Sequence, residues 1–203
     1  MADRALADIL HEKDALKMCE GHSQCFPPQV LSLYNLCKGL KSVMEIGFNA
    51  GHSCEVFLTS SPDIHVTSFD INMYPYTKIG VDYFAEYYPG RHEFVPGNSL
   101  TTVPAYPDKK FDLIFVDGGH DYNTALGDLM NCRRLAHSGT VVVMDDIVGP
   151  ERMMHWNEGP VRAWTEMVDK GLIIETGREE YMKGRGIAKG RFSPSSGLRS
   201  SCT

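Results

Sequence analysis

Four residues with reactive side chains follow two apolar, strand-like segments in the second half of the chain. Asp117 and His120 follow the first segment, residues 111–116, and Asp145 with Asp146 directly follows the second. If the two segments are neighbouring parallel strands, their ends lie about 5 Å apart. Carboxylates that close raise one another's pKa unless a cation lies among them. The pattern therefore predicts a divalent-metal site beside His120, which could accept a proton near neutral pH.

A second group of residues could bind a ribose. The segment 45–53 (EIGFNAGHS) passes from a strand into a helix through Gly47 and Gly51, so the backbone can approach a ligand closely. Asp70 ends the next strand, where nucleotide-binding folds place an acid that accepts hydrogen bonds from ribose hydroxyls. The glycine pattern lacks the full GxGxxG, so a nucleoside without phosphates fits better than a dinucleotide. The alternative is an ordinary tight turn, and Glu45 argues against it, because an acid in an apolar strand needs a donor or a cation.

The elements that would position these groups alternate along the chain. After an expected N-terminal amphipathic helix and a break at Pro27-Pro28, we expect strands at 42–46, 64–69, 92–95, 111–116 and 140–144, and helices at 29–40, 51–60, 77–88, 121–136 and 160–170. Residues 172–175 and 185–191 are expected to form an antiparallel hairpin. This order predicts an α/β fold: a single Rossmann-like domain whose mostly parallel seven-stranded sheet ends in an antiparallel C-terminal hairpin, with helices on both faces. The expected division is helices that cover the site at 1–40, the main domain at 41–192 and a disordered, Ser-rich tail at 193–203.

Composition narrows the classes of partner. The net charge is −6, the 203 residues contain no Lys/Arg-rich block, and a nucleic-acid partner is therefore not expected. No apolar run approaches the ~20 residues that span a bilayer, and the N-terminus does not resemble a signal peptide. The six cysteines are dispersed without zinc-ligand spacing, which favours free thiols in a reducing compartment. We expect a cytoplasmic protein with a small-molecule partner and no membrane partner, and a homo-oligomer is compatible with the sequence.

Several motifs together resemble a known family. EIGFNAG, the strand-end Asp70, GNS at 97–99 and FDLIFVDGGH are similar to class I methyltransferases that use S-adenosylmethionine, and the resemblance covers residues 42–147. The closer resemblance is to small metal-dependent O-methyltransferases, both the catechol type and the type that methylates sugar hydroxyls of macrolide-like natural products. It implies divalent-metal-dependent transfer of a methyl group from S-adenosylmethionine to a hydroxyl of a small molecule, either a sugar or a phenolic, catechol-like compound.

The resemblance also implies a role for each matching residue. The residues expected to bind the cofactor are Glu45, Gly47, Asn49, Gly51, Ser53, Asp70, Asn98, Ser99 and Asp117. The expected metal ligands are Asp117, Asp145 and Asp146, and the expected general base is His120. All-oxygen ligation suits Mg²⁺ first, with Mn²⁺ and Ca²⁺ also compatible. Asp146 stands where the catechol type has Asn, and His120 where it has Lys, so both departures favour the sugar-hydroxyl type.

Each of these roles has a structural alternative. Asp145 and Asp146 could cap the segment that follows them. His120 could cap or pack against the next helix, and acids such as Asp117 are common at strand ends in α/β folds. The metal site is predicted from their joint occurrence.

Other residues are candidates for ligand contacts without a motif to support them. Met154, His155 and Trp156 lie in a loop after the second acid-bearing strand, and they could contact the acceptor or pack in the core. Residues 73–76 (MYPY) could cover the adenine or pack internally. The further candidates are His22 and Gln24, near the Pro-Pro break, whereas Tyr83, Tyr87 and Tyr88 are expected to form a packed or solvated helix face.

Two rival functions are compatible with the same pattern. One is a hydroxylase-type tailoring enzyme that uses the same fold and cofactor frame, and the other is a non-catalytic protein that binds S-adenosylmethionine. The intact set of acids with His120 argues against the second, because a pure binder has no physical need for clustered acids. An NAD-dependent dehydrogenase is disfavoured by the incomplete glycine pattern.

Overall fold

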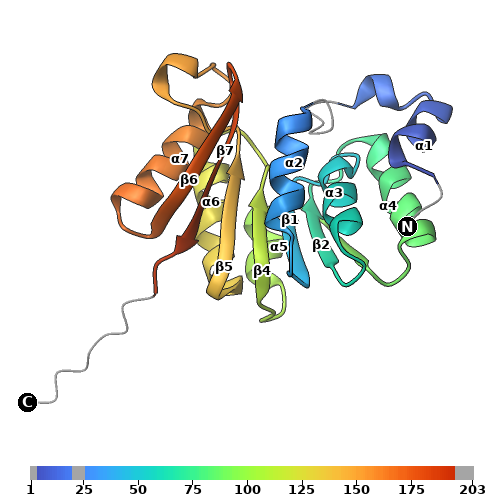
Figure 1. Cartoon of the computed structure of the whole chain (residues 1–203), viewed down its shortest axis with the longest axis horizontal. Coiled ribbons are helices and arrows are strands. Elements are labelled where there is room, and N and C mark those ends of the chain that lie inside the picture. The colour runs from blue at the N-terminus through green and yellow to red at the C-terminus, as the bar shows by residue number, and fades with distance from the viewer. Residues whose placement is uncertain (1–3, 20–25, 195–203) are drawn as a thin grey trace, which may run out of the picture.

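The computed structural model describes residues 4–19 and 26–194, and Figure 1 shows its elements. The candidate contacts His22 and Gln24, and residues 195–203 of the expected tail, lie outside the described residues.

Seven strands in the described part form one sheet. Their bounds are β1 (Ser42–Ile46), β2 (His65–Asp70), β3 (His92–Pro96), β4 (Phe111–Val116), β5 (Ala136–Asp145), β6 (Ile173–Met182) and β7 (Arg185–Phe192). They lie in the order β3-β2-β1-β4-β5-β7-β6. The first five pair in parallel, and β7 is antiparallel to both β5 and β6. The predicted fold class is therefore confirmed.

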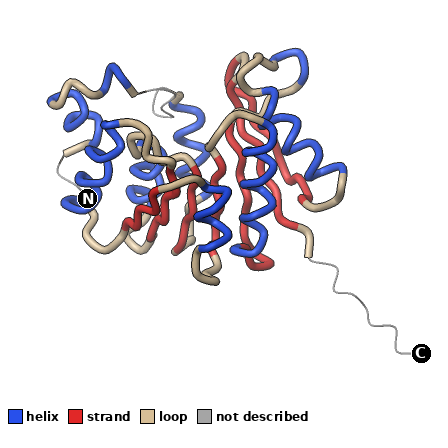
Figure 2. The backbone as a smooth tube through the Cα atoms, turned by 180° about the vertical axis from the view of Figure 1, so that it is seen from behind, coloured by secondary structure: helices blue, strands red, loops and turns tan. Residues whose placement is uncertain are grey.

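Helices cover both faces of this sheet (Figures 1 and 2). The α-helices are α1 (Leu6–Glu12), α2 (Pro27–Leu36), α3 (His52–Ser60), α4 (Pro75–Tyr87), α5 (Ser99–Ala105), α6 (Tyr122–Cys132) and α7 (Glu158–Asp169). Short 3₁₀ turns lie at Leu16–Met18, Arg133–Leu135 and Pro150–Arg152. None of the helices within the described ranges is long and apolar enough to cross a membrane.

The structure corrects several element boundaries. Pro27-Pro28, expected as a break, begins α2, because proline fits the first helical turn, where its missing N–H is not needed. The expected N-terminal helix ends at Glu12, and Asp14 has a left-handed backbone with φ 53°. The strand expected at 172–175 continues as β6 to Met182, with exposed and partly covered residues alternating at the edge of the sheet. Helix α5, which contains Pro104, was not among the expected helices.

Alternate residues of the central strands enter two separate hydrophobic clusters. Val43 of β1 and Phe115 of β4 pack on the side of α1–α4, whereas Met44 and Ile114 pack on the side of α5–α7. This follows from the pleat of a strand, which points successive side chains to opposite faces. The carboxyl ends of the parallel strands thus lie between two packed layers. Open α/β sheets bind ligands just beyond these strand ends.

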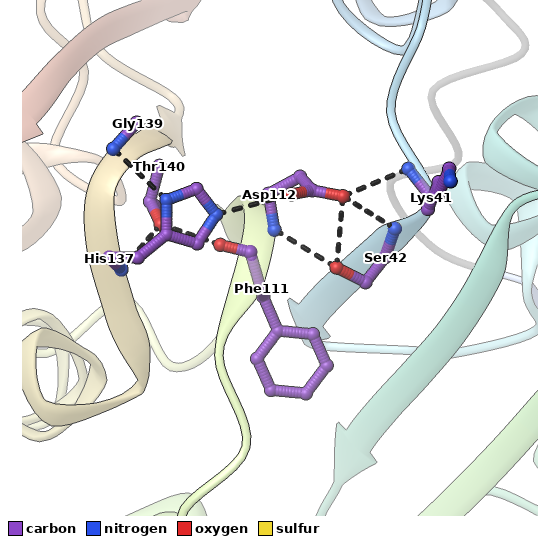
Figure 3. Close-up of polar contacts among 7 residues, drawn as sticks. All are labelled: Lys41, Ser42, Phe111, Asp112, His137, Gly139 and Thr140. Atoms are coloured by element: carbon purple, nitrogen blue, oxygen red, sulfur yellow. Dashed lines mark hydrogen bonds and ion pairs between the residues drawn. The ribbon is translucent and has the colours of Figure 1, made fainter.

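At the other end of the parallel strands, where they begin, Asp112 joins three of them (Figure 3). Its Oδ2 accepts hydrogen bonds from the backbone N–H groups of Lys41 and Ser42, both at 2.9 Å. Its Oδ1 lies 3.1 Å from Nε2 of His137, in β5. Thr140 Oγ1 completes the link by donating to the Phe111 carbonyl at 2.5 Å. These bonds hold β1, β4 and β5 in register far from the site residues.

Candidate active site

A cavity of about 690 Å³ lies at the carboxyl ends of β1, β2 and β4. This volume is typical of small-molecule sites, which span ~300–1,000 Å³. One part of its wall is the β1–α3 turn with Asp70, and another is the β4–α6 loop with Asp117 and His120. Asp146, Trp156 and Arg185 also line it. Most of the residues selected from the sequence therefore meet in one cavity.

The β1–α3 turn lies directly against the end of β4. Gly47 has φ 95°, and a Cβ placed on it would lie 1.8 Å from the carbonyl oxygen of Asp117. Only glycine allows this approach, and it also leaves the turn backbone open to a ligand. Asn49, with φ 53°, donates its backbone N–H to Asp70 Oδ2 at 2.8 Å. Asp70 Oδ1 accepts from the Asn72 N–H at 2.6 Å, so the carboxylate that lines the cavity is held from two sides.

Glu45 is fully buried beneath the turn and is not part of the cavity wall formed by the described residues. Ser53 Oγ donates to its Oε2 at 2.7 Å, and Ser68 Oγ donates to its Oε1 at 2.5 Å. Burial raises the pKa of Glu45 to about 7, although the two hydroxyl donors oppose the shift. Gly51, with φ 96°, abuts the rings of Phe48 and Phe84. Of these residues, only Ser53 and Phe48 reach the cavity.

Asn98 and Ser99, the pair that the resemblance places beside an adenine, both line the cavity. Asn98 is the N-cap of α5, and its side-chain oxygen accepts from the Leu100 N–H at 2.9 Å. Asn98 is thus fixed by helix capping.

Asp117, His120 and Asp146 form a group of possible metal ligands. One ligand atom from each lies within 4.8 Å of the others. His120 Nε2 is 3.0 Å from Asp146 Oδ2. Asp146 has a left-handed backbone with φ 62°, and Asn157 Nδ2 donates to its carbonyl at 2.9 Å. The β4–α6 loop and the end of β5 thus bring the three side chains together.

Asp145 points away from this group. Gln29 of α2 is fully buried and donates from Nε2 to Asp145 Oδ2 at 2.7 Å. Asp145 Oδ1 accepts the backbone N–H of Asp146 at 2.8 Å. Both oxygens of Asp145 therefore have partners within the protein.

Burial and mutual repulsion shift the titration of these acids. Burial, with Asp145 and Asp146 nearby, raises the pKa of Asp117 well above its usual range. Burial also raises the pKa of Asp145 to about 7, despite the Gln29 donor. The hydrogen bond to Asp146 raises the pKa of His120 against the opposing effect of burial. A cation among these acids would relieve their mutual repulsion.

Arg185 is a site residue that the sequence analysis missed. Its Nη1 lies 3.3 Å from Asp146 Oδ1, so His120 and Arg185 occupy the two oxygens of one carboxylate. The guanidinium carbon lies 4.9 Å from the centre of the Trp156 ring and 5.3 Å from that of Phe26. In the sequence Arg185 is one of many charges in an expected hairpin. Only the pairing of β7 with β5 brings it to the end of β5, beside Asp146.

Of the other candidate contacts, some line the cavity and others do not. Trp156 lines the cavity with its ring centre 5.6 Å from that of His120, whereas Met154 and His155 do not belong to the wall. Met73 and Tyr74 line the cavity and are followed by buried Tyr76. Tyr83 of α4 and Tyr88, which follows the helix, are buried in the core, and Tyr87 is partly buried.

Comparison with solved structures shows the class I methyltransferase fold. An O-methyltransferase from Bacillus cereus in complex with S-adenosylhomocysteine has a TM-score of 0.73 and 19% identity, covering 93% of this chain and 90% of that one. The O-methyltransferase TomG from Streptomyces achromogenes, involved in tomaymycin synthesis and in complex with S-adenosylmethionine, has a TM-score of 0.68 and 19% identity, covering 96% and 92%. An S-adenosylhomocysteine-bound methyltransferase from Podospora anserina has a TM-score of 0.68 and 15% identity, covering 96% and 89%.

Sequence comparison gives one match. No curated protein matches the chain. A family model described as a methyltransferase domain matches residues 44–147, which contain the glycine turn, Asp70 and all the acids of the cluster. Because this match spans just over half of the 203 residues, the chain belongs to the methyltransferase domain family.

Proposed function

We propose that this protein transfers a methyl group from S-adenosylmethionine to a hydroxyl oxygen of a small molecule, with a divalent metal ion in the site. The observation that carries the proposal is the single cavity that joins the Gly47 turn and Asp70 to Asp117, His120 and Asp146. Solved structures of the same fold bind S-adenosylmethionine or S-adenosylhomocysteine, which supports the choice of cofactor.

In the proposed complex, the cofactor lies along the wall from Ser99 to Asp70. Asp70 accepts hydrogen bonds from both ribose hydroxyls, and its bonds to the Asn49 and Asn72 N–H groups hold it in place for them. Asn98 and Ser99 contact the adenine. Glu45 and Gly51 contribute from beneath by shaping the turn, and Ser53 reaches the amino-acid end of the cofactor.

The reaction is an in-line displacement at carbon. A lone pair of the acceptor oxygen forms the new O–CH₃ bond, and the electrons of the breaking C–S bond return to sulfur to give S-adenosylhomocysteine. The hydroxyl proton passes to His120, and Asp146 orients the imidazole and stabilises its charged form. With the Nε2–H donated to Asp146, Nδ1 is the nitrogen that accepts this proton. General-base help of this kind contributes typically ~10²–10⁴-fold in rate.

The protein ligands proposed for the metal are the carboxylates of Asp117 and Asp146. Oxygen ligation suits Mg²⁺ first, with Mn²⁺ also compatible. A bound divalent ion would lower the pKa of the acceptor hydroxyl and fix its direction. Asp145 contributes as a third oxygen ligand only if it exchanges its Gln29 partner, so we assign it to positioning Asp146. His120 Nε2 cannot bind a metal and donate to Asp146 at once, so we assign His120 to the general-base role alone.

The first experiment tests the cofactor half. We expect S-adenosylhomocysteine to bind in calorimetry, and Asp70→Asn to weaken that binding at least ten-fold, because the ribose hydroxyls lose a charged acceptor. Asp63→Asn is the matched control, since Asp63 is an exposed acid outside the cavity wall. Equal affinities for the Asp70→Asn variant and the control would contradict the placement of the cofactor.

The second experiment tests catalysis. A screen of catechols, hydroxybenzoates, flavonoids and sugar-bearing natural products with methyl-labelled S-adenosylmethionine should identify an acceptor. His120→Ala should then lower kcat by about 10²-fold or more while cofactor affinity stays the same. EDTA should stop turnover, and Mg²⁺ or Mn²⁺ should restore it. Full turnover in EDTA would remove the metal from the proposal, and equal losses in kcat and cofactor affinity would make His120 a structural residue.

We place the protein in the reducing cytoplasm. The support is that Cys19, Cys37, Cys54 and Cys132 are free thiols and that no pair of them within the described residues forms a disulfide. Its proposed partner is a small hydroxylated molecule, and a homo-oligomer remains part of the proposal to be tested by solution mass.

A further inference from the structure

Arg185 is a cation in the cavity wall to which the proposed reaction assigns no role. It begins β7, and the antiparallel pairing of β7 with β5, where Asp145 faces Ile187, brings it beside Asp146. Its side chain is 23% exposed, and it is one of the residues that line the cavity. The guanidinium is therefore largely covered by protein yet open to a ligand.

Two aromatic rings hold this guanidinium. Trp156, from the loop after β5, and Phe26, at the start of α2, lie 4.9 Å and 5.3 Å from it. Attraction between a cation and the faces of such rings restricts the orientation of the side chain. A cation that is held before the ligand arrives loses little conformational entropy on binding.

Most of the hydrogen-bonding capacity of Arg185 is unused by the protein. A guanidinium carries five N–H donors in a rigid fork. Among the described residues its one polar partner is Asp146, through a single contact of 3.3 Å to Nη1. Its nitrogen atoms are not among the buried polar atoms that lack a partner, so the remaining donors are accessible.

Building on the function proposed above, we propose that Arg185 binds a carboxylate of the acceptor, so that the acceptor is a small hydroxy acid. The fork of an arginine matches a carboxylate through two parallel hydrogen bonds, and a neutral acceptor would leave those donors without a protein or ligand partner. His120 and Arg185 contact the two oxygens of the same Asp146 carboxylate. The reacting hydroxyl and the carboxylate of the acceptor are therefore only a few bonds apart, as in an ortho-hydroxybenzoate, whose ring would pack against Trp156.

The test compares two ligands of the same shape that differ in charge. In calorimetry with protein saturated by S-adenosylhomocysteine, 2,3-dihydroxybenzoate should bind at least ten-fold more tightly than 2,3-dihydroxybenzamide. Arg185→Gln should abolish that preference and leave the affinity for the amide and for S-adenosylhomocysteine unchanged. Arg185→Lys should retain only part of the preference, because an ammonium cannot form the two-point contact. Arg178→Gln is the control, since Arg178 is also paired with one carboxylate in this hairpin but lies outside the cavity wall.

The outcomes separate the proposal from its rivals. Equal weakening of both ligands in Arg185→Gln would mean that Arg185 acts by holding Asp146, and it would overturn the carboxylate subsite. Wild-type protein that shows no preference for the benzoate, or does not bind it, would overturn the subsite without any variant. The titration is also repeated without S-adenosylhomocysteine, so that the subsite can be tested independently of the proposed function. If the protein does not bind S-adenosylhomocysteine but still prefers the benzoate, the subsite is supported and methyl transfer is contradicted.

Discussion

Asp146 shows how single residues create the acid cluster. Its backbone has φ 62°, a conformation that an L-residue adopts at a cost of roughly 1–2 kcal/mol. Asn157 Nδ2 donates to the Asp146 carbonyl, and the Asp146 N–H donates to Asp145 Oδ1, so both ends of that residue are held in place. The result is a buried carboxylate whose two oxygens face His120 and Arg185. A group held so firmly can orient an imidazole or a metal ion without reorganising.

Gly47 gives the sharpest prediction for a single residue. Gly47→Ala should lower the free energy of unfolding by at least about 3 kcal/mol and abolish S-adenosylhomocysteine binding, because the new Cβ would overlap the Asp117 carbonyl. Chemical denaturation and calorimetry measure both effects.

The control for this prediction is Gly39→Ala. Gly39 also has a positive φ, 78°, but no atom lies within 4 Å of a Cβ placed on it. Its substitution should cost only the backbone term of roughly 1–2 kcal/mol and leave binding intact. Similar losses in the two variants would show that the close approach of β1 to β4 does not define the site.

At the scale of secondary structure, the two ends of the central strands have different roles. The carboxyl ends of the strands carry the cavity and its strained turns, whereas Asp112 holds the opposite ends of β1, β4 and β5 together. Burial raises the pKa of Asp112, but hydrogen bonds from Lys41, His137 and Ser42 outweigh this effect, and its pKa is lower than usual. The lowered pKa means that the folded state favours the ionised carboxylate.

We therefore predict a stability loss in Asp112→Ala that depends on pH. Because the folded pKa lies below the unfolded value of ~3.9, the contribution of Asp112 is fully present above that value and is lost as pH falls through the folded pKa. At pH 6 the variant should be less stable by about 1–2 kcal/mol, and the difference should narrow as pH approaches 3. Urea denaturation at several pH values measures this.

Asp108→Ala is the comparison for the same experiment. Asp108 has a lowered pKa too, through its ion pair with Lys110, but its side chain is 74% exposed. Solvent and salt screen an ion pair this exposed, so this variant should change little in stability at any pH. An Asp112→Ala loss that is the same at pH 3 and pH 6 would rule out the ionised carboxylate as its cause.

At the scale of the whole molecule, α2 connects the N-terminal part of the chain to the active site. Gln29 reaches Asp145 across 116 residues of sequence, and Phe26 lies over the guanidinium of Arg185. Helix α2 also packs on α3, which follows the β1–α3 turn. Gln29 of α2 and Phe26 just before it thus contact Asp145 and Arg185, which come from the C-terminal half of the sheet.

Gln29→Ala should therefore destabilise the protein from a distance. Removing the amide leaves the buried Asp145 carboxyl without its side-chain donor, and we expect the free energy of unfolding to fall by about 2 kcal/mol. Asn35→Ala, on the exposed side of the same helix, should stay within about 0.5 kcal/mol of the wild type. Thermal or chemical denaturation of both variants decides the matter, and equal effects would show that the Gln29 contact contributes nothing specific.

Local signals in the sequence were sufficient for most of the fold. Apolar, β-branched runs that alternate with helical periodicity predicted the five parallel strands, because burial on both faces demands such runs, and two further runs around a charged turn predicted the C-terminal hairpin. Boundaries were less predictable at proline, which can either begin a helix or interrupt one. Pro27 begins α2, and α5, capped by Asn98, forms despite Pro104. The strand-end positions of Asp70, Asp117 and Asp146 were also readable, since a polar residue after an apolar run marks the rim of a sheet.

The sequence by itself determined the α/β fold, the glycine turn and the acids at the rim, because each depends on residues close together in the chain. The tertiary structure alone decided that Asp145 turns to Gln29, that Asp146 lies between His120 and Arg185, and that Trp156 and Phe26 enclose the guanidinium. These contacts join α2, β5, β7 and two loops that are far apart in sequence. Their side chains meet only because sheet order and helix packing place them, and periodicity along one chain carries no signal of such distances.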